Sequence, residues 1–158
     1  MSNLRPGPSG RRSTRKRGQA MVEFAIVLPI FMLVLSGICD FGFMLYQRMT
    51  VISAAREGAR AAAMAEDPAM IVVTAQNAAT GAALGGGVAV TNVVARCYPT
   101  KADPSSTTPM PDCIAAVNGD SVAVEVDYTY HWFFPAVLAV APTYNLSSTV
   151  QMVFDNLP

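Results

Sequence analysis

The sequence predicts an α+β fold, made of a long N-terminal helix, a second helix and a small antiparallel sheet. Three observations predict it. Residues 20–46 are almost uncharged and apolar, and they run into the Ala-rich, helix-favouring segment 47–66. A triple glycine at 85–87 separates this helical part from the C-terminal half of the chain. In that half, "SVAVEVDYTY" at 121–130 alternates between apolar and polar residues, which is typical of a strand with one buried face.

The charged side chains are distributed unevenly along the chain. The 158 residues carry 11 basic and 11 acidic side chains, but a cluster of the basic ones precedes residue 18 and none of the acids does. This basic arm is rich in Pro, Gly and Ser and has little to bury, so by itself it is expected to be disordered. The remainder has an excess of acids, so we do not expect it to bind nucleic acid.

Residues 20–46 are expected to cross a membrane. Only Glu23 and Asp40 are charged in this stretch. As a helix it would be about 40 Å long, against a hydrocarbon core of roughly 30 Å. Because the basic arm precedes the span, the N-terminus is expected in the cytoplasm and the rest of the chain outside. Asp40 is expected at the outer interface, and Pro29 either kinks the helix or is simply tolerated.

The helix is expected to continue beyond the membrane surface through the Ala-rich segment. Arg56 and Arg60 lie one turn apart there, which favours a solvated face, with a subunit contact as the alternative. Asp67 and Pro68 then end this helix and begin a second one over 68–84. The triple glycine stops that second helix.

Two weaker strand candidates, 88–98 and 146–154, would join 121–130 in a three-stranded antiparallel sheet with one wet face. Glu125 and Asp127 lie on the polar face of the central candidate. Two carboxylates on one face can resemble a catalytic pair, but an exposed polar face is the favoured interpretation.

The segment "HWFFPAVLAVAP", 131–142, is too short to span a membrane. Packing on the sheet is favoured for it. Contact with the membrane and contact with a neighbouring subunit are the alternatives.

Cys97 and Cys113 bracket a polar, Pro-rich loop, and outside the cytoplasm such a pair favours a disulfide over two free thiols. On the chain-entropy model, closing this loop would contribute about 3 kcal/mol. A zinc site is not expected, because the chain has one histidine, His131, and no CxxC motif. Cys39 lies in the span and is expected to act as a small apolar residue.

Glu23 needs an explanation, because an ionised carboxylate in hydrocarbon costs several kcal/mol unless it is paired or close to the interface. It follows Gly18, the end of the basic arm, by five residues. A cleaved secretory signal, a lipoprotein signal and a twin-arginine signal all fit the sequence around the span poorly, and none of them explains Glu23.

The stretch "GQAMVEF", 18–24, resembles the processing site of type IV pilin-like precursors. More specifically, "VEFAIVLPIFMLVLSGICDFGFMLY" followed by "AAREGARAAA" is similar to the TadE-like proteins, pseudopilins of the tight-adherence (Tad/Flp) pilus system. The resemblance implies a pilin-like fold and cleavage between Gly18 and Gln19 by a membrane prepilin peptidase. It also implies that Glu23 and Phe24 act in assembly, with Glu23 attracting the new amino terminus of a neighbouring subunit. Pairing within one chain and snorkelling of Glu23 to the interface are the alternatives.

The resulting hypothesis is a processed, non-enzymatic, membrane-anchored pseudopilin that acts in assembly of Tad/Flp-type adhesive pili. Its expected partners are the prepilin peptidase, other pilins or pseudopilins, the Tad secretion machinery and membrane lipid, with no cofactor and no nucleic acid. It would reside in the bacterial inner membrane, with incorporation into the pilus left open. The expected parts are a cleaved cytoplasmic leader (1–18), the transmembrane helix with its extension (19–66) and an extracytoplasmic α+β domain (67–158). The alternative is an unprocessed, single-pass, signal-anchored protein whose outer domain binds a partner.

Overall fold

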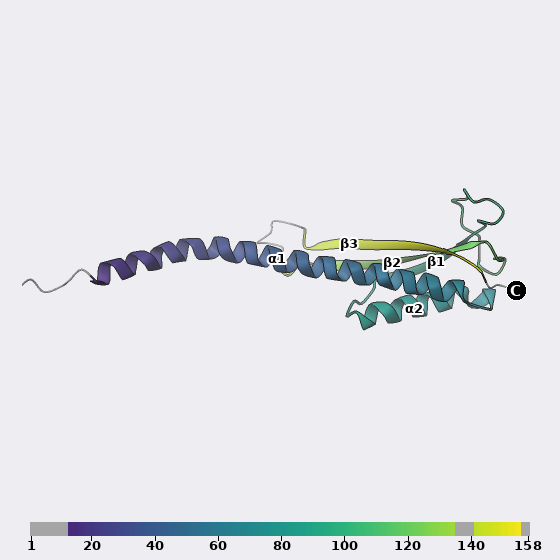
Figure 1. Ribbon diagram of the computed structural model, residues 1–158, viewed down its shortest axis with the longest axis horizontal. Coiled ribbons are helices and arrows are strands. Elements are labelled where there is room, and N and C mark those ends of the chain that lie inside the picture. The colour runs from purple at the N-terminus through teal and green to yellow at the C-terminus, as the bar shows by residue number, and fades with distance from the viewer. Residues whose placement is uncertain (1–12, 135–140, 156–158) are drawn as a thin grey trace, which may run out of the picture. The chain divides into compact units, whose positions relative to one another are not determined.

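The computed structural model describes residues 13–134 and 141–155 and has the expected α+β arrangement (Figure 1). Its elements, in chain order, are α1 (Ser13–Ala63), the short 3-10 helix η1 (Pro68–Met70), α2 (Ile71–Gly85), β1 (Asn92–Tyr98), β2 (Ser121–His131) and β3 (Thr143–Val153). The chain divides into two compact units, Met1–Cys39 and Asp40–Pro158, and the boundary falls within α1.

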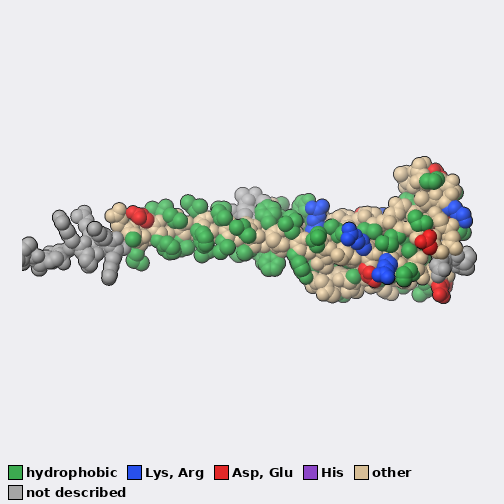
Figure 2. Space-filling view, in the orientation of Figure 1, with side chains coloured by type: hydrophobic (Ala, Val, Ile, Leu, Met, Phe, Trp, Pro, Cys, Tyr) green, Lys and Arg blue, Asp and Glu red, His purple; other side chains and the backbone are tan. Residues whose placement is uncertain are grey.

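The first unit presents apolar side chains on all sides of its helix. Met21, Phe24 and Ile26 are each more than half exposed, and Figure 2 shows hydrophobic side chains covering this stretch. Such a surface is unfavourable in water but suits hydrocarbon, because the helix satisfies its own backbone hydrogen bonds. α1 is long and apolar enough to cross a membrane, and its most apolar window is not buried in the protein. Pro29 lies inside the helix without ending it.

The second unit is built on an antiparallel sheet in the order β1-β2-β3, with β2 in the centre. Val122, Val124 and Val126 of β2 are fully buried, as their alternation predicts. β2 pairs with β3 along its whole length, from Ser121 opposite Val153 to His131 opposite Thr143. The buried face of this sheet forms one side of the core.

Small residues on two helices form the other side of the core. Ala55 and Ala59 of α1 and Ala75 and Ala79 of α2 are all fully buried in one cluster with the valines of β2. Gly58 lies where these elements approach most closely: a Cβ added there would lie 2.8 Å from Cβ of Ala79 and 2.9 Å from the carbonyl oxygen of Ala75. Gly58 lowers helix propensity, but it permits this close packing.

The ends of the second helix follow from local chemistry. Asp67 caps the start, where its carboxylate accepts a hydrogen bond of 2.9 Å from the backbone N–H of Ala69, and the first turn is a 3-10 turn. At the other end Gly87 has a φ of +76°, and the N–H of Val88 donates to the carbonyl of Ala83 at 2.9 Å. Val88 therefore completes the helix end and is buried there, so β1 begins at Asn92, later than the expected residue 88.

Candidate functional site

Glu23 lies on the exposed helix of the first unit, one turn after Gln19. The side-chain amide Nε2 of Gln19 donates a hydrogen bond of 3.2 Å to Oε1 of Glu23. A carboxylate has about four lone-pair positions, and no ion pair forms at Glu23 among the side chains of residues 18–134 and 141–155. Phe24 beside it is also exposed. Glu23 therefore retains the capacity to accept further hydrogen bonds, or a cation, from outside the chain.

Gly18 precedes this pair and has open space around it. A Cβ added at Gly18 would meet no atom within 4 Å, and the same is true of Gly42 later in the helix. Neither glycine is required by packing within the chain. A requirement for glycine at residue 18 would therefore have to come from recognition by another molecule.

Asp40 has a structural role that the sequence alone did not indicate. It is fully buried, and its carboxylate accepts hydrogen bonds from the backbone N–H groups of Phe133 and Phe134, each at 3.0 Å. The hydroxyl of Tyr130 donates to the carbonyl oxygen of Asp40 at 3.0 Å and lies 3.4 Å from its Oδ1. We refer to Asp40, Tyr130, Phe133 and Phe134 as the Asp40 clamp. It ties the end of β2 to α1.

The electrostatics of this clamp depend on a protonated phenol. Burial, together with the negative charge of Asp40, raises the pKa of Tyr130 to about 12. Tyr130 therefore stays neutral at ordinary pH and acts as a donor to Asp40. Its phenol and two backbone N–H groups supply the hydrogen bonds that a buried carboxylate requires.

Aromatic rings surround the clamp. Phe41 packs edge-on against Trp132 with a centroid distance of 5.3 Å, and the ring centroids of Phe43 and Phe133 are 5.6 Å apart. We call these four residues the aromatic cluster. Trp132 also contacts the ring of Tyr130 at 5.2 Å. The described part of the segment 131–142 thus packs against α1 and the end of β2, while its residues 135–140 lie outside the described residues.

The comparison with known families identifies the N-terminal part of the chain. Residues 18–60 match the model of the TadE-like protein family. The matched stretch, hereafter the TadE-like segment, contains Gly18, Gln19, Glu23, Phe24 and Asp40. No curated protein and no solved structure matches the chain significantly. The resemblance seen in the sequence is confirmed over residues 18–60, which include most of the exposed apolar stretch of α1.

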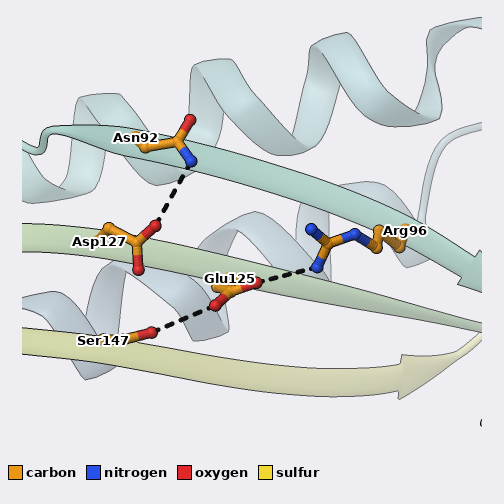
Figure 3. A network of polar contacts seen from close by, with 5 residues as sticks. All are labelled: Asn92, Arg96, Glu125, Asp127 and Ser147. Atoms are coloured by element: carbon orange, nitrogen blue, oxygen red, sulfur yellow. Dashed lines mark hydrogen bonds and ion pairs between the residues drawn. The ribbon is translucent and has the colours of Figure 1, made fainter.

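Outside the TadE-like segment, the two carboxylates on the polar face of the sheet have separate partners (Figure 3). Glu125 forms an ion pair of 2.9 Å with Arg96 and accepts a hydrogen bond of 3.4 Å from Ser147, whereas Asp127 accepts one of 3.4 Å from Asn92. These contacts cross from β2 to both neighbouring strands and support the sheet, although exposed pairs of this kind each contribute little. Within the described part of the chain, no group of three or more His, Cys, Asp or Glu could hold a metal ion.

Cys97 and Cys113 form a disulfide in the structure, and both are buried. Their Cα atoms are 5.4 Å apart, within the usual range. The buried carboxylate of Asp120 accepts hydrogen bonds from the N–H groups of Lys101 and Val117, at 3.1 and 3.0 Å. The bridge and this carboxylate together fix the long loop between β1 and β2.

Proposed function

We propose that this chain is a membrane-anchored pseudopilin that is cut between Gly18 and Gln19 and then acts, without catalysis of its own, in assembly of Tad/Flp-type adhesive pili. The observation that carries the proposal is an exposed carboxylate, Glu23, on the exposed apolar part of α1, five residues after Gly18, a glycine within the helix that has open space around it. The match of residues 18–60 to the TadE-like family supports it.

Cleavage would give Glu23 a chemical partner. It creates a positively charged α-amino group on Gln19, while the side chain of that residue already reaches Glu23. In hydrocarbon both charges are costly when isolated, so an ammonium from a neighbouring subunit and the free lone pairs of Glu23 stabilise each other. Each incoming subunit would then be selected by charge pairing and retained by apolar contacts along the helix.

The partners and topology follow from this proposal. A prepilin peptidase removes the basic leader on the cytoplasmic side of the inner membrane, and the α+β domain lies outside. Phe24 lies beside Glu23 and contributes apolar contact area to the next subunit. Other pilins or pseudopilins and the Tad secretion machinery are the assembly partners.

Processing is tested by the mass of the mature protein in cells that contain the peptidase. Loss of residues 1–18 is expected in the wild type, and Gly18→Ala is expected to retain them. Gly42→Ala is a matched control, because it changes helix propensity equally and also meets open space. Retention of the leader in the wild type would favour the unprocessed, signal-anchored alternative, and normal cleavage of Gly18→Ala would remove the assigned role of that glycine.

Assembly is tested separately by Glu23→Gln, which keeps the size of the side chain and removes its charge. We expect normal insertion and cleavage but a loss of surface pili. Ser36→Ala, on the same helix, serves as the control, because among the described residues the hydroxyl of Ser36 bonds to backbone carbonyls of its own helix. Normal piliation with Glu23→Gln would contradict the charge pairing.

A further inference from the structure

The aromatic surface beside the Asp40 clamp has no role in the proposed function. Phe41, Phe43 and Phe133 are each at least half exposed to solvent, although large aromatic side chains are costly to leave in water. They come from two segments far apart in sequence, α1 and the residues just after β2, which the clamp holds together. The exposed rings are therefore fixed in place by buried polar contacts.

A groove adjoins this cluster. It has a volume of about 360 Å³ and is lined by Phe41 and Met44 of α1, by Trp132, and by β3 residues that include Tyr144 and Leu146. Arg48, on the same face of α1 two turns after Phe41, also lines it. Arg48 is exposed and forms no ion pair with any side chain that the structure describes. Asn145 and Ser147 add polar groups to the lining. The groove therefore combines aromatic and apolar walls with polar groups and with one cation, Arg48, that has no ion-pair partner among the described side chains.

We propose that the aromatic cluster and this groove seat the folded domain on the outer leaflet of the membrane, with the rings at the level of the lipid ester groups and Arg48 on a phospholipid phosphate. The inference rests on the membrane anchoring in the proposed function and adds a second, surface contact to it.

The spacing along α1 supports lipid as the occupant. At 1.5 Å per residue the helix rises about 27 Å from Glu23 to Phe41, close to the thickness of a hydrocarbon core of roughly 30 Å. With Glu23 near the inner interface, Phe41 lies at the outer one, where aromatic side chains are enriched. Arg48 lies about 10 Å further along the helix, at the depth of the headgroups, and an arginine there binds phosphate well. The surface thus includes the residue at which a span that begins near Glu23 would end, and its cation is complementary in charge to phospholipid.

The single tryptophan of the chain, Trp132, makes this contact measurable. The full-length protein is reconstituted in phosphatidylcholine vesicles containing phosphatidylglycerol, and flotation first establishes that it is anchored. Vesicles with lipids brominated near the ester group are then compared with vesicles brominated near the chain end. We expect blue-shifted Trp132 emission that the shallow bromines quench more strongly than the deep ones.

Two exposed substitutions test the assigned contacts without disturbing the core. Arg48→Gln is expected to lower the ratio of docked to undocked protein about fivefold on anionic vesicles, and Phe133→Ser is expected to reduce quenching further. Ile114→Ser is the matched control, because Ile114 is as exposed as Phe133 but lies on the disulfide loop. It should leave quenching unchanged.

The outcomes separate this inference from the proposed function. Protein that fails to float contradicts the anchoring itself. If the protein floats but its Trp132 is not quenched by bromine and is accessible to iodide, the proposed surface contact is wrong while the membrane anchoring still holds. Unquenched Trp132 together with cross-links between copies through Phe133→Cys would assign the surface to a second copy of the chain, and would also overturn the inference.

Discussion

Replacing Asp40 with asparagine is the most direct test of how the second unit is held together. The substitution keeps the shape of the side chain but leaves it one oxygen. The backbone N–H groups of Phe133 and Phe134 each donate to a different carboxylate oxygen at 3.0 Å. In Asp40→Asn one of them therefore faces an amide N–H₂ group, and the other bonds to a neutral acceptor.

The expected cost follows from these two contacts. A hydrogen bond to a charged group contributes about 1.5–3 kcal/mol and one to a neutral group about 1 kcal/mol. Losing one hydrogen bond and weakening the other costs about 3–4 kcal/mol of stability. The substitution also removes the cost of burying a charged carboxylate, which offsets part of this loss. We expect a net loss of about 2 kcal/mol in the free energy of unfolding.

Urea unfolding of the full-length chain in detergent micelles measures this loss through Trp132 emission, because Trp132 packs between Tyr130 and Phe41. A loss of about 2 kcal/mol lowers the midpoint by about 1 M urea for a protein of this size. Asp127→Asn is the control: its carboxylate is on the polar face of the sheet, and we expect a change of less than about 0.5 kcal/mol. Equal midpoints for the two variants would show that Asp40 does not hold the end of β2.

Three further predictions concern the second unit. Gly58→Ala should destabilise it by about 1–3 kcal/mol, because the added methyl group collides with α2. Gly81→Ala, in open space on α2, should instead stabilise it by up to about 1 kcal/mol. Chemical unfolding of both variants measures this difference. Replacing Cys97 and Cys113 by serine should cost about 2–4 kcal/mol, and a reducing agent should lower the stability of the wild type but not of the double variant. Because the raised pKa of Tyr130, about 12, exceeds its unfolded value of 10.0, the folded state retains a proton that the unfolded state loses. The free energy of unfolding should therefore fall by up to about 2–3 kcal/mol between pH 10 and 12. When unfolding is measured at a series of pH values, Tyr130→Phe should lack this decrease.

The features predicted well from the sequence are those encoded over short distances. The apolar stretch of α1, the Asp67 cap, the stop at the triple glycine and the alternation of β2 each depend on residues within a few positions of one another. The arrangement of Gly18, Glu23 and Phe24 is equally local, and it led to the family that residues 18–60 match.

The features missed depend on contacts across the chain. Asp40 bonds to residues more than ninety positions away, and nothing near it in the sequence indicates that pairing. Gly58 is unfavourable for a helix on its local sequence alone, and its role in packing depends on Ala75 and Ala79, which belong to another element. β3 begins at Thr143, before the expected residue 146, since pairing with β2 extends a strand beyond its own apolar pattern.

The position of Asp40 also has a mechanical consequence. It is the first residue of the second unit, so a tensile load applied to the N-terminal part of α1 would enter the folded unit there. The bonds from Asp40 to Phe133 and Phe134 would pass that load to the residues just after β2, whose last part, Tyr128–His131, pairs with β3. Because β2 pairs with β3 along its whole length and with β1 further along, force entering there would be shared among paired strands rather than borne by the contact of one helix with the sheet.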